Sequence, residues 1–202
     1  MKTLIRLLIL SFLALPGGCS QGAQLPHLAA DGVVLAFGDS ITAGTGAGPG
    51  ESYPDQLGGL TGRKIINAGV PGEVTAEGLA RLPEQLENAK PSLLILCHGG
   101  NDLIRRLDQR QAAENLRGMI RLARERGVAV LLVAVPSPDL SLRPPAFYAE
   151  IAAEFGIPIE SKALARILGK GSLKSDYIHP NAAGYRQLAE ALATLLKKSG
   201  AI

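Results

Sequence analysis

Long apolar runs constrain the fold of this chain more than any other feature of its sequence. Val33–Phe37, Leu93–His98 and Val128–Val135 are hydrophobic almost throughout, without the alternation of a strand that has one solvated face. Continuous runs of this kind are typical of strands that are covered on both faces. Lys64–Asn67 and the short Ile157–Ile159 complete the set of predicted strands. Helices are therefore expected on each side of a buried sheet.

Segments with helical spacing separate these runs. Apolar residues three and four apart predict helices over Thr75–Ala89, Asp108–Arg126 and Asn181–Lys198. A further helix is predicted over Pro145–Phe155, ended by Gly156. Strands that alternate with helices form βαβ units, whose right-handed crossovers place helices on both faces of a parallel sheet. The sequence predicts an α/β fold, a three-layer α/β/α sandwich with about five parallel strands, flavodoxin-like in type.

The first 19 residues are predicted to be a secretory signal. A basic start precedes the apolar run Leu7–Leu15, which is too short to span a bilayer, and small residues that end in Cys19 follow. Cys19 after two glycines resembles a bacterial lipobox, in which the cysteine becomes the lipidated first residue, although Pro16 stands where that motif has an aliphatic residue. The alternative is ordinary signal cleavage nearby, which leaves a soluble periplasmic protein.

The expected organisation follows from this leader. Residues 1–19 are predicted to be the signal peptide, residues 20–32 a polar tether, and residues 33–202 a single domain. We expect an exported, periplasmic monomer, held at the membrane where Cys19 is lipidated. The formal net charge is +3, and loss of Lys2 and Arg6 with the leader lowers it to +1 (3 − 2). So small a charge, with no Trp and 4% aromatic residues, argues against nucleic-acid binding.

Polar clusters follow the first three predicted strands. They are Gly38-Asp39-Ser40, Asn67-Ala68-Gly69 and Gly99-Gly100-Asn101-Asp102. Ligands of parallel α/β sheets bind at the carboxyl ends of the strands, so these clusters are expected on one rim. Ser40 is then either a nucleophile presented at a strand end or only the N-cap of the next helix.

Asp176 and His179 lie three residues apart before the last predicted helix. A serine hydroxyl becomes a good nucleophile when an imidazole takes its proton, and a carboxylate fixes the tautomer of that imidazole. The pair can supply both groups from one turn. The alternative is a surface loop in which His179 and Asn181 cap the last helix.

Two further segments offer hydrogen-bond donors for an oxyanion. Asn101 in HGGND can direct its side-chain amide into a site, and Gly72 in NAGVPGEVT can offer its backbone N–H. Each segment is also good turn sequence by itself. Four unrelated turns would together have to imitate all the parts of a serine hydrolase, which favours the catalytic interpretation.

In this order the segments resemble the blocks of the SGNH, or GDSL, hydrolase family. GDSIT resembles the first block, GVPGEVT the second, GGND the third and DYIHPN the last. The resemblance covers nearly the whole mature domain and is greatest to the bacterial branch of acyl-CoA thioesterase I, lysophospholipase L1 and the arylesterases.

The resemblance implies a serine esterase that acts through an acyl-enzyme. It implies Ser40 as nucleophile, His179 as base and Asp176 as the group that orients the base. The oxyanion hole would consist of the backbone N–H groups of Ser40 and Gly72 and the side-chain amide of Asn101. Gly69 is the alternative second-block glycine, and we favour Gly72 because an acid, Glu73, follows it.

The expected partner is a small acyl ester, and neither a metal nor another cofactor is expected. Cys97 and His98 are adjacent strand residues on opposite faces and form no metal site by themselves. Asp39 is expected to hold its loop and His98 to pack against or line the site. Leu140 and Leu142 either line an acyl groove or lie in a solvent loop, and we expect short to medium acyl chains.

Other functions are alternatives. A carbohydrate O-acetylesterase would use the same residues, and a non-catalytic ligand-binding module could have the same fold. A phosphate-binding module is disfavoured because the Gly-rich segment after Ser40 lacks the lysine of a P-loop.

Overall fold

The computed structural model describes residues 22–202, so the predicted signal peptide and Cys19 lie outside the described residues. A sheet of five parallel strands in the order β2-β1-β3-β4-β5 forms the centre of the molecule. The strands are β1 (Val33–Gly38), β2 (Lys64–Gly69), β3 (Leu93–Cys97), β4 (Ala129–Val133) and β5 (Ile159–Glu160).

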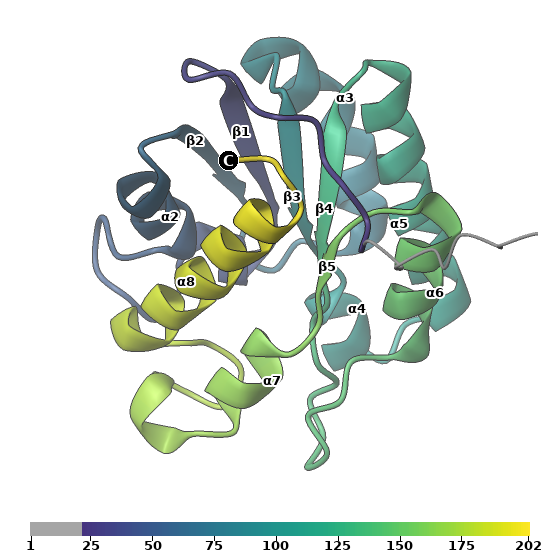
Figure 1. Ribbon diagram of the computed structural model, residues 1–202. Coiled ribbons are helices and arrows are strands. Elements are labelled where there is room, and N and C mark those ends of the chain that lie inside the picture. Colours follow the sequence, from purple (N-terminus) through teal and green to yellow (C-terminus); the bar gives the residue numbers. More distant parts are fainter. Residues whose placement is uncertain (1–21) are drawn as a thin grey trace, which may run out of the picture.

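Helices cover the sheet on both sides. They are α1 (Ser40–Ala43), α2 (Tyr53–Thr61), α3 (Thr75–Ala89), α4 (Gly100–Ile104), α5 (Gln109–Glu125), α6 (Ala146–Phe155), α7 (Ala163–Leu168) and α8 (Ala182–Lys198), with a 3-10 turn η1 at Gly171–Leu173. Helices α2 and α8 pack together on one side of the sheet, and α3 and α5 on the other (Figure 1). The predicted three-layer α/β/α architecture is confirmed.

The long helices begin and end close to their predicted bounds. The predicted first residues Asp108, Pro145 and Asn181 each precede the helix as its N-cap. The Asp108 carboxylate accepts the Arg110 N–H, and the Asn181 side chain accepts the Gly184 N–H. No helix was predicted for α2 or α7.

The strands differ from their predicted lengths at the ends. β4 is shorter than Val128–Val135, because the ladder with β3 begins only at Ala129. β5 begins at Ile159 rather than Ile157, since Ile157 packs into the core and Pro158 has no N–H to donate. β1 and β2 each extend to a glycine, and these two glycines, Gly38 and Gly69, are paired in the ladder.

The expected tether is shorter than residues 20–32. Leu25 and Leu28 are buried, and their backbone N–H groups donate to the carbonyls of Ser199 and Ala201, both at 2.8 Å. These leucines cover apolar surface beside the C-terminus, so they belong to the domain. Among the helices that the structure describes, none has the length and apolar character needed to cross a membrane.

The core explains why the apolar runs lack alternation. Every residue of β3 is buried, and β1 and β4 are buried apart from their first residues. Fully burying one leucine or isoleucine side chain contributes about 1.5–3 kcal/mol. The sheet is thereby fixed in place, and its carboxyl rim becomes a rigid support for the loops that follow.

Candidate active site

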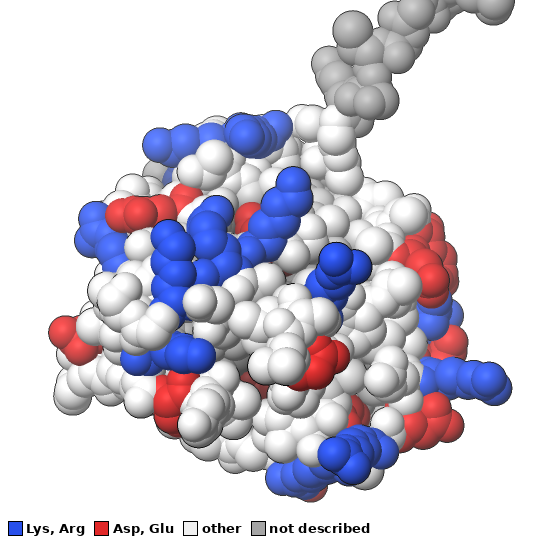
Figure 2. Space-filling model, turned by 90° about the horizontal axis from the view of Figure 1, so that it is seen from below, with Lys and Arg blue, Asp and Glu red and all other residues white. Residues whose placement is uncertain are grey.

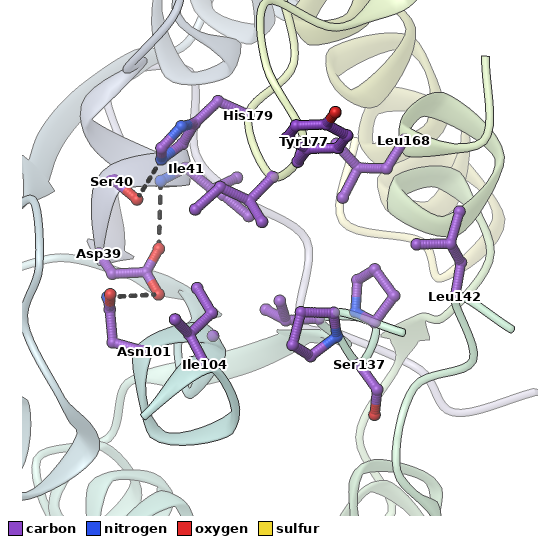
Figure 3. Close-up of a pocket in the computed structure, with 15 residues that line it drawn as sticks. Asp39, Ser40, Ile41, Asn101, Ile104, Ser137, Leu142, Leu168, Tyr177 and His179 are labelled. Carbon is purple, nitrogen blue, oxygen red and sulfur yellow. Dashed lines mark hydrogen bonds between the residues drawn. The ribbon is translucent and has the colours of Figure 1, made fainter. Parts of the chain in front are cut away.

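Ser40 lies where β1 ends and α1 begins. Asp39 caps the short helix, with its Oδ1 accepting the Ile41 N–H at 3.1 Å. The Ser40 side chain is half-buried, and its Oγ lies 3.0 Å from His179 Nε2 (Figure 3). Burial raises the pKa of the Asp39 carboxyl, although the neighbouring His98 and the Ile41 N–H oppose that shift.

His179 joins Ser40 to Asp176. Its Nδ1 lies 2.7 Å from Asp176 Oδ2, while Asp176 Oδ1 accepts the backbone N–H groups of Ile178 and His179 at 2.8 Å each. An ionised carboxylate only accepts hydrogen bonds, so Nδ1 carries the proton and Nε2 presents its lone pair to the serine hydroxyl. Partial burial opposes the charge of Asp176, but the hydrogen bonds from His179 and Ile178 outweigh it and lower its pKa.

Backbone contacts hold both ends of the turn that carries Asp176 and His179. The Ser175 N–H donates to the His179 carbonyl at 3.0 Å, and Lys174 forms a bridge with Pro180. Asn181 caps α8, as one alternative for this loop predicted, whereas the His179 ring turns toward Ser40. Within this turn, Asn181 therefore caps the helix, while His179 places the imidazole beside Ser40.

Asn101 lies in α4, beside the loop that carries Gly72. Its Nδ2 donates to the Glu73 carbonyl at 3.0 Å and lies 3.5 Å from Asp39 Oδ2. Gly72 has φ +81°, a left-handed conformation that suits glycine, and its carbonyl accepts from Arg105 Nη2 at 2.7 Å. The backbone N–H of Gly69, the alternative glycine, is bound to Asn67 Oδ1 at 3.0 Å.

A buried ionic cluster lies behind this loop, and apart from the acid after Gly72 no sequence motif predicts it. The guanidinium of Arg81 donates to both carboxylate oxygens of Glu73 at 2.7 Å, and His98 Nε2 lies 3.0 Å from Glu73 Oε2. Partial burial alone would raise the pKa of Glu73, but hydrogen bonds from Arg81 and His98 lower it to about 2. His98 is completely buried and lies against the side chain of Glu73 rather than in the pocket.

The hydrogen bonds of His98 fix its tautomer. The Gly99 N–H donates to His98 Nδ1 at 3.0 Å, so Nδ1 carries a lone pair and the ring proton is on Nε2, directed at Glu73. Together with the bond from Asn101 to the Glu73 carbonyl, this links the loop of Gly72 to the turn of Asn101 at two points. No sequence motif predicted this connection between the loop of Gly72 and the turn of Asn101.

A small pocket of about 30 Å³ opens beside Ser40. Apolar side chains form most of its wall, and its lining residues are Asp39, Ser40, Ile41, Gly100, Asn101, Ile104, Val135, Pro136, Ser137, Pro138, Leu142, Leu168, Tyr177, Ile178 and His179. Ser40, Asn101 and His179 thus face one cavity, whereas Gly72 is not part of its wall (Figure 3). Of the two leucines in this loop, Leu142 lines the cavity and Leu140 lies in solvent.

Metal-binding side chains do not gather anywhere in residues 22–202. No group of three or more His, Cys, Asp or Glu side chains in that part of the chain is placed to hold an ion. Cys97 is a buried free thiol, and burial raises its pKa well above the ordinary value. The groups gathered at the carboxyl end of the sheet are the hydroxyl of Ser40, the imidazole of His179, the carboxylate of Asp176 and the amide of Asn101.

Comparisons with known proteins agree with this chemistry. The signature of the GDSL-like Lipase/Acylhydrolase family matches residues 36–187. Esterase TesA of Pseudomonas aeruginosa is 32% identical over 192 residues, which cover 89% of this chain and 95% of the esterase. Thioesterase 1/protease 1/lysophospholipase L1 of Escherichia coli K12 is 28% identical over 177 residues, 84% of this chain and 85% of that enzyme. A crystal structure of TesA superimposes with a TM-score of 0.73 at 28% identity and covers 82% of this chain and 98% of that one.

Proposed function

The chain belongs to the GDSL-like Lipase/Acylhydrolase family and is a serine esterase, and we propose that Ser40, His179 and Asp176 are its catalytic residues. The observation that carries this proposal is the unbroken chain of hydrogen-bond contacts from Asp176 through His179 to Ser40, with distances of 2.7 and 3.0 Å. Neither an O-acetylesterase nor a non-catalytic binding module is favoured by the comparisons.

Acylation begins with proton transfer from Ser40 Oγ to His179 Nε2. The oxygen attacks the ester carbonyl carbon, and the electron pair of the C=O bond moves to its oxygen. We assign the backbone N–H groups of Ser40 and Gly72 and the amide of Asn101 as donors to that oxyanion. Asn101 Nδ2 donates to the Glu73 carbonyl at 3.0 Å and makes a longer contact of 3.5 Å with Asp39 Oδ2, and in this proposal the oxyanion replaces Asp39 in that longer contact. The intermediate then collapses, and His179 gives its proton to the departing alcohol or thiol.

Deacylation uses the same groups in reverse order. His179 takes a proton from water, the hydroxide attacks the acyl carbon, and the acid leaves as Ser40 regains its proton. Asp176 stabilises the imidazolium in both steps, and its lowered pKa keeps it ionised near neutral pH. These steps require no metal and no cofactor, so none is part of the proposal.

A short to medium acyl chain fits the pocket best. The cavity beside Ser40 is small, about 30 Å³, and its wall beyond Ser40 consists mainly of aliphatic side chains and prolines, which suits a short acyl group better than a long one. Thioesters and lysophospholipids enter the proposal through the name of the Escherichia coli relative. A series of p-nitrophenyl esters of increasing length is expected to give its highest kcat/KM at short or medium chains, and a strict requirement for an acetylated sugar would contradict this.

Export and lipidation remain proposals that rest on the leader alone. We propose a periplasmic monomer whose Cys19 is acylated after signal cleavage. Intact mass of the protein from bacterial membranes is expected to show the acyl groups, and Cys19→Ser is expected to abolish them. A mature mass without acyl groups in the wild-type protein would contradict lipidation but leave the esterase proposal untouched.

Hydrolysis of p-nitrophenyl butyrate by Ser40→Ala tests the catalytic proposal. We expect kcat/KM to fall by about 10⁴-fold or more, because the hydroxyl is the nucleophile. Ser161→Ala, which changes a serine outside the pocket, is the matched control and should keep the wild-type rate. Full activity of a correctly folded Ser40→Ala protein would overturn the assignment.

A further inference from the structure

Exposed apolar side chains gather at one end of the molecule. Six large hydrophobic residues among the described ones are exposed, namely Leu60, Val70, Ile104, Leu107, Leu140 and Tyr177. Only Leu60, on α2 just before β2 begins, lies at the amino end of the sheet. The other five belong to the loops and short helix at the carboxyl end, where Ser40 lies. Single exposed leucines are ordinary in folded proteins. Several exposed apolar side chains around one pocket mouth indicate a surface that binds another molecule.

Four of these side chains surround the opening of the pocket. Ile104 and Tyr177 form part of its wall, yet Ile104 is 43% and Tyr177 90% exposed. Leu107 follows one turn after Ile104. Leu140 is fully exposed near the tip of the loop that contributes Pro138 and Leu142 to the wall. Ile104 ends α4 and the other three residues lie on loops, and their exposed side chains can insert into the apolar part of a lipid layer.

Cations accompany the apolar residues. Arg105 and Arg106 follow Ile104, Arg143 lies in the loop of Leu140, and the Lys174 ammonium is 5.9 Å from the centre of the Tyr177 ring. Three exposed acids, Asp108, Asp139 and Asp176, lie among these cations, so the four cations exceed the acids by one (4 − 3). Figure 2, which views this end, shows Lys and Arg side chains on several sides of a mostly uncharged area, with Asp and Glu side chains among them.

We propose that this surface, hereafter the mouth face, docks onto an anionic lipid surface and presents the pocket to it. The mouth face consists of Ile104, Leu107, Leu140 and Tyr177 with Arg105, Arg106, Arg143 and Lys174. Leucine and an aromatic ring at the level of the headgroups, with basic residues around them, are the features that hold a peripheral protein at an anionic interface. Contact between two copies through the same face would instead bring the cations of both copies together.

Sedimentation with lipid vesicles tests this proposal apart from catalysis. The protein would begin at residue 20, after the predicted leader, so that neither the apolar leader nor an acyl group on Cys19 contributes to binding, and it would carry Ser40→Ala, which prevents hydrolysis. Vesicles of phosphatidylcholine alone are compared with vesicles that contain phosphatidylglycerol in equal amount. We expect the protein to bind the anionic vesicles and to dissociate from them as salt is raised.

Variants in that background identify the surface. Leu107→Ser with Leu140→Ser should lower the apparent affinity for anionic vesicles by about 10-fold or more, because both side chains leave the interface. Arg143→Gln should weaken it less, and Leu60→Ser, the matched exposed leucine at the opposite end, should leave it unchanged. No binding of the parent protein, or equal loss in the Leu60→Ser protein, would overturn the proposal.

Two further measurements separate the alternatives. With Ser40 intact, the Leu107→Ser, Leu140→Ser protein should hydrolyse dissolved p-nitrophenyl butyrate at the wild-type rate, since neither residue lines the pocket. Sedimentation equilibrium without lipid should give the same mass for both proteins. A dimer that these substitutions dissociate would contradict the lipid proposal and assign the mouth face to a second copy of the chain.

Discussion

At the scale of single residues, Glu73 connects the parts of the proposed oxyanion hole. Its carboxylate accepts from Arg81 and His98, and its carbonyl accepts from Asn101, so both ends of the residue are fixed. Gly72, whose N–H we assign to the oxyanion, directly precedes it. A carboxylate that is only 6% exposed is tolerated here because a guanidinium and an imidazole N–H satisfy it.

Glu73→Gln should therefore impair catalysis as well as stability. We expect kcat to fall by about 10- to 100-fold with little change in KM, because the donors to the oxyanion lose their alignment while the pocket wall is kept. The free energy of unfolding should decrease by about 3 kcal/mol, since Arg81 loses its buried partner. Steady-state kinetics and urea unfolding measure both effects, and Glu84→Gln on the exposed face of α3 is the control. A stability loss without any loss of kcat would limit Glu73 to a structural role.

The Glu73 carboxylate should also make the stability of the protein depend on pH in the acid range. Its pKa is about 2 in the folded protein, below the ordinary value of 4.5, so the unfolded chain binds the proton more readily between these values. Glu73 therefore contributes stability above pH 4.5 that is lost as the pH falls toward 2. The difference in unfolding free energy between wild type and Glu73→Gln should shrink over this interval. A difference that stays constant there would show that the carboxylate is not held as described.

At the scale of elements, the ends of β1 and β2 explain how closely α1 approaches the sheet. A Cβ at Gly38 would meet the Cys97 carbonyl, and one at Gly69 would meet the backbone N of Ala43. Both contacts involve backbone, which has no room to move without shifting the strand that carries Ser40. The glycines at these strand ends are therefore required by packing.

Two glycine substitutions should act in opposite directions. Gly69→Ala is expected to destabilise the fold by several kcal/mol, because the added methyl group overlaps the backbone of α1. Gly59→Ala should stabilise it by about 0.5–1 kcal/mol, since that position lies within α2 with no atom within 4 Å of the new methyl group. Thermal unfolding of both proteins measures this, and equal effects would contradict the described contact.

The sequence predicts the long elements well and the short ones poorly. The helices α3, α5, α6 and α8 have strong leucine or alanine spacing, and Asp108 and Asn181 cap α5 and α8. The pair Gly58-Gly59 obscures the helical pattern of α2, which forms because Ser52 caps it and because it packs on α8. Leu25 and Leu28 lie in a polar segment, and only the fold shows that the C-terminal residues receive them. Local patterns carry no information on contacts made so far along the chain.

At the scale of the whole molecule, the parallel sheet gathers distant residues onto one rim. Ser40 follows β1, Asn101 follows β3 and His179 precedes α8, and all three face the same cavity. These residues were predicted from sequence because each stands in a short motif of its own. The cluster of Glu73, Arg81 and His98 was not predicted, since its members come from a loop, a helix and a strand and form a unit only in space.

Covalent labelling by a fluorophosphonate tests the central claim most directly. The reagent phosphonylates a serine whose hydroxyl is activated by a base, so intact mass should show one adduct per chain and peptide mapping should place it on Ser40. Ser40→Ala should remain unlabelled, and His179→Ala should react far more slowly because no base takes the proton. A folded wild-type protein that stays unlabelled, or an adduct on any other residue, would contradict the proposal that Ser40 is the nucleophile.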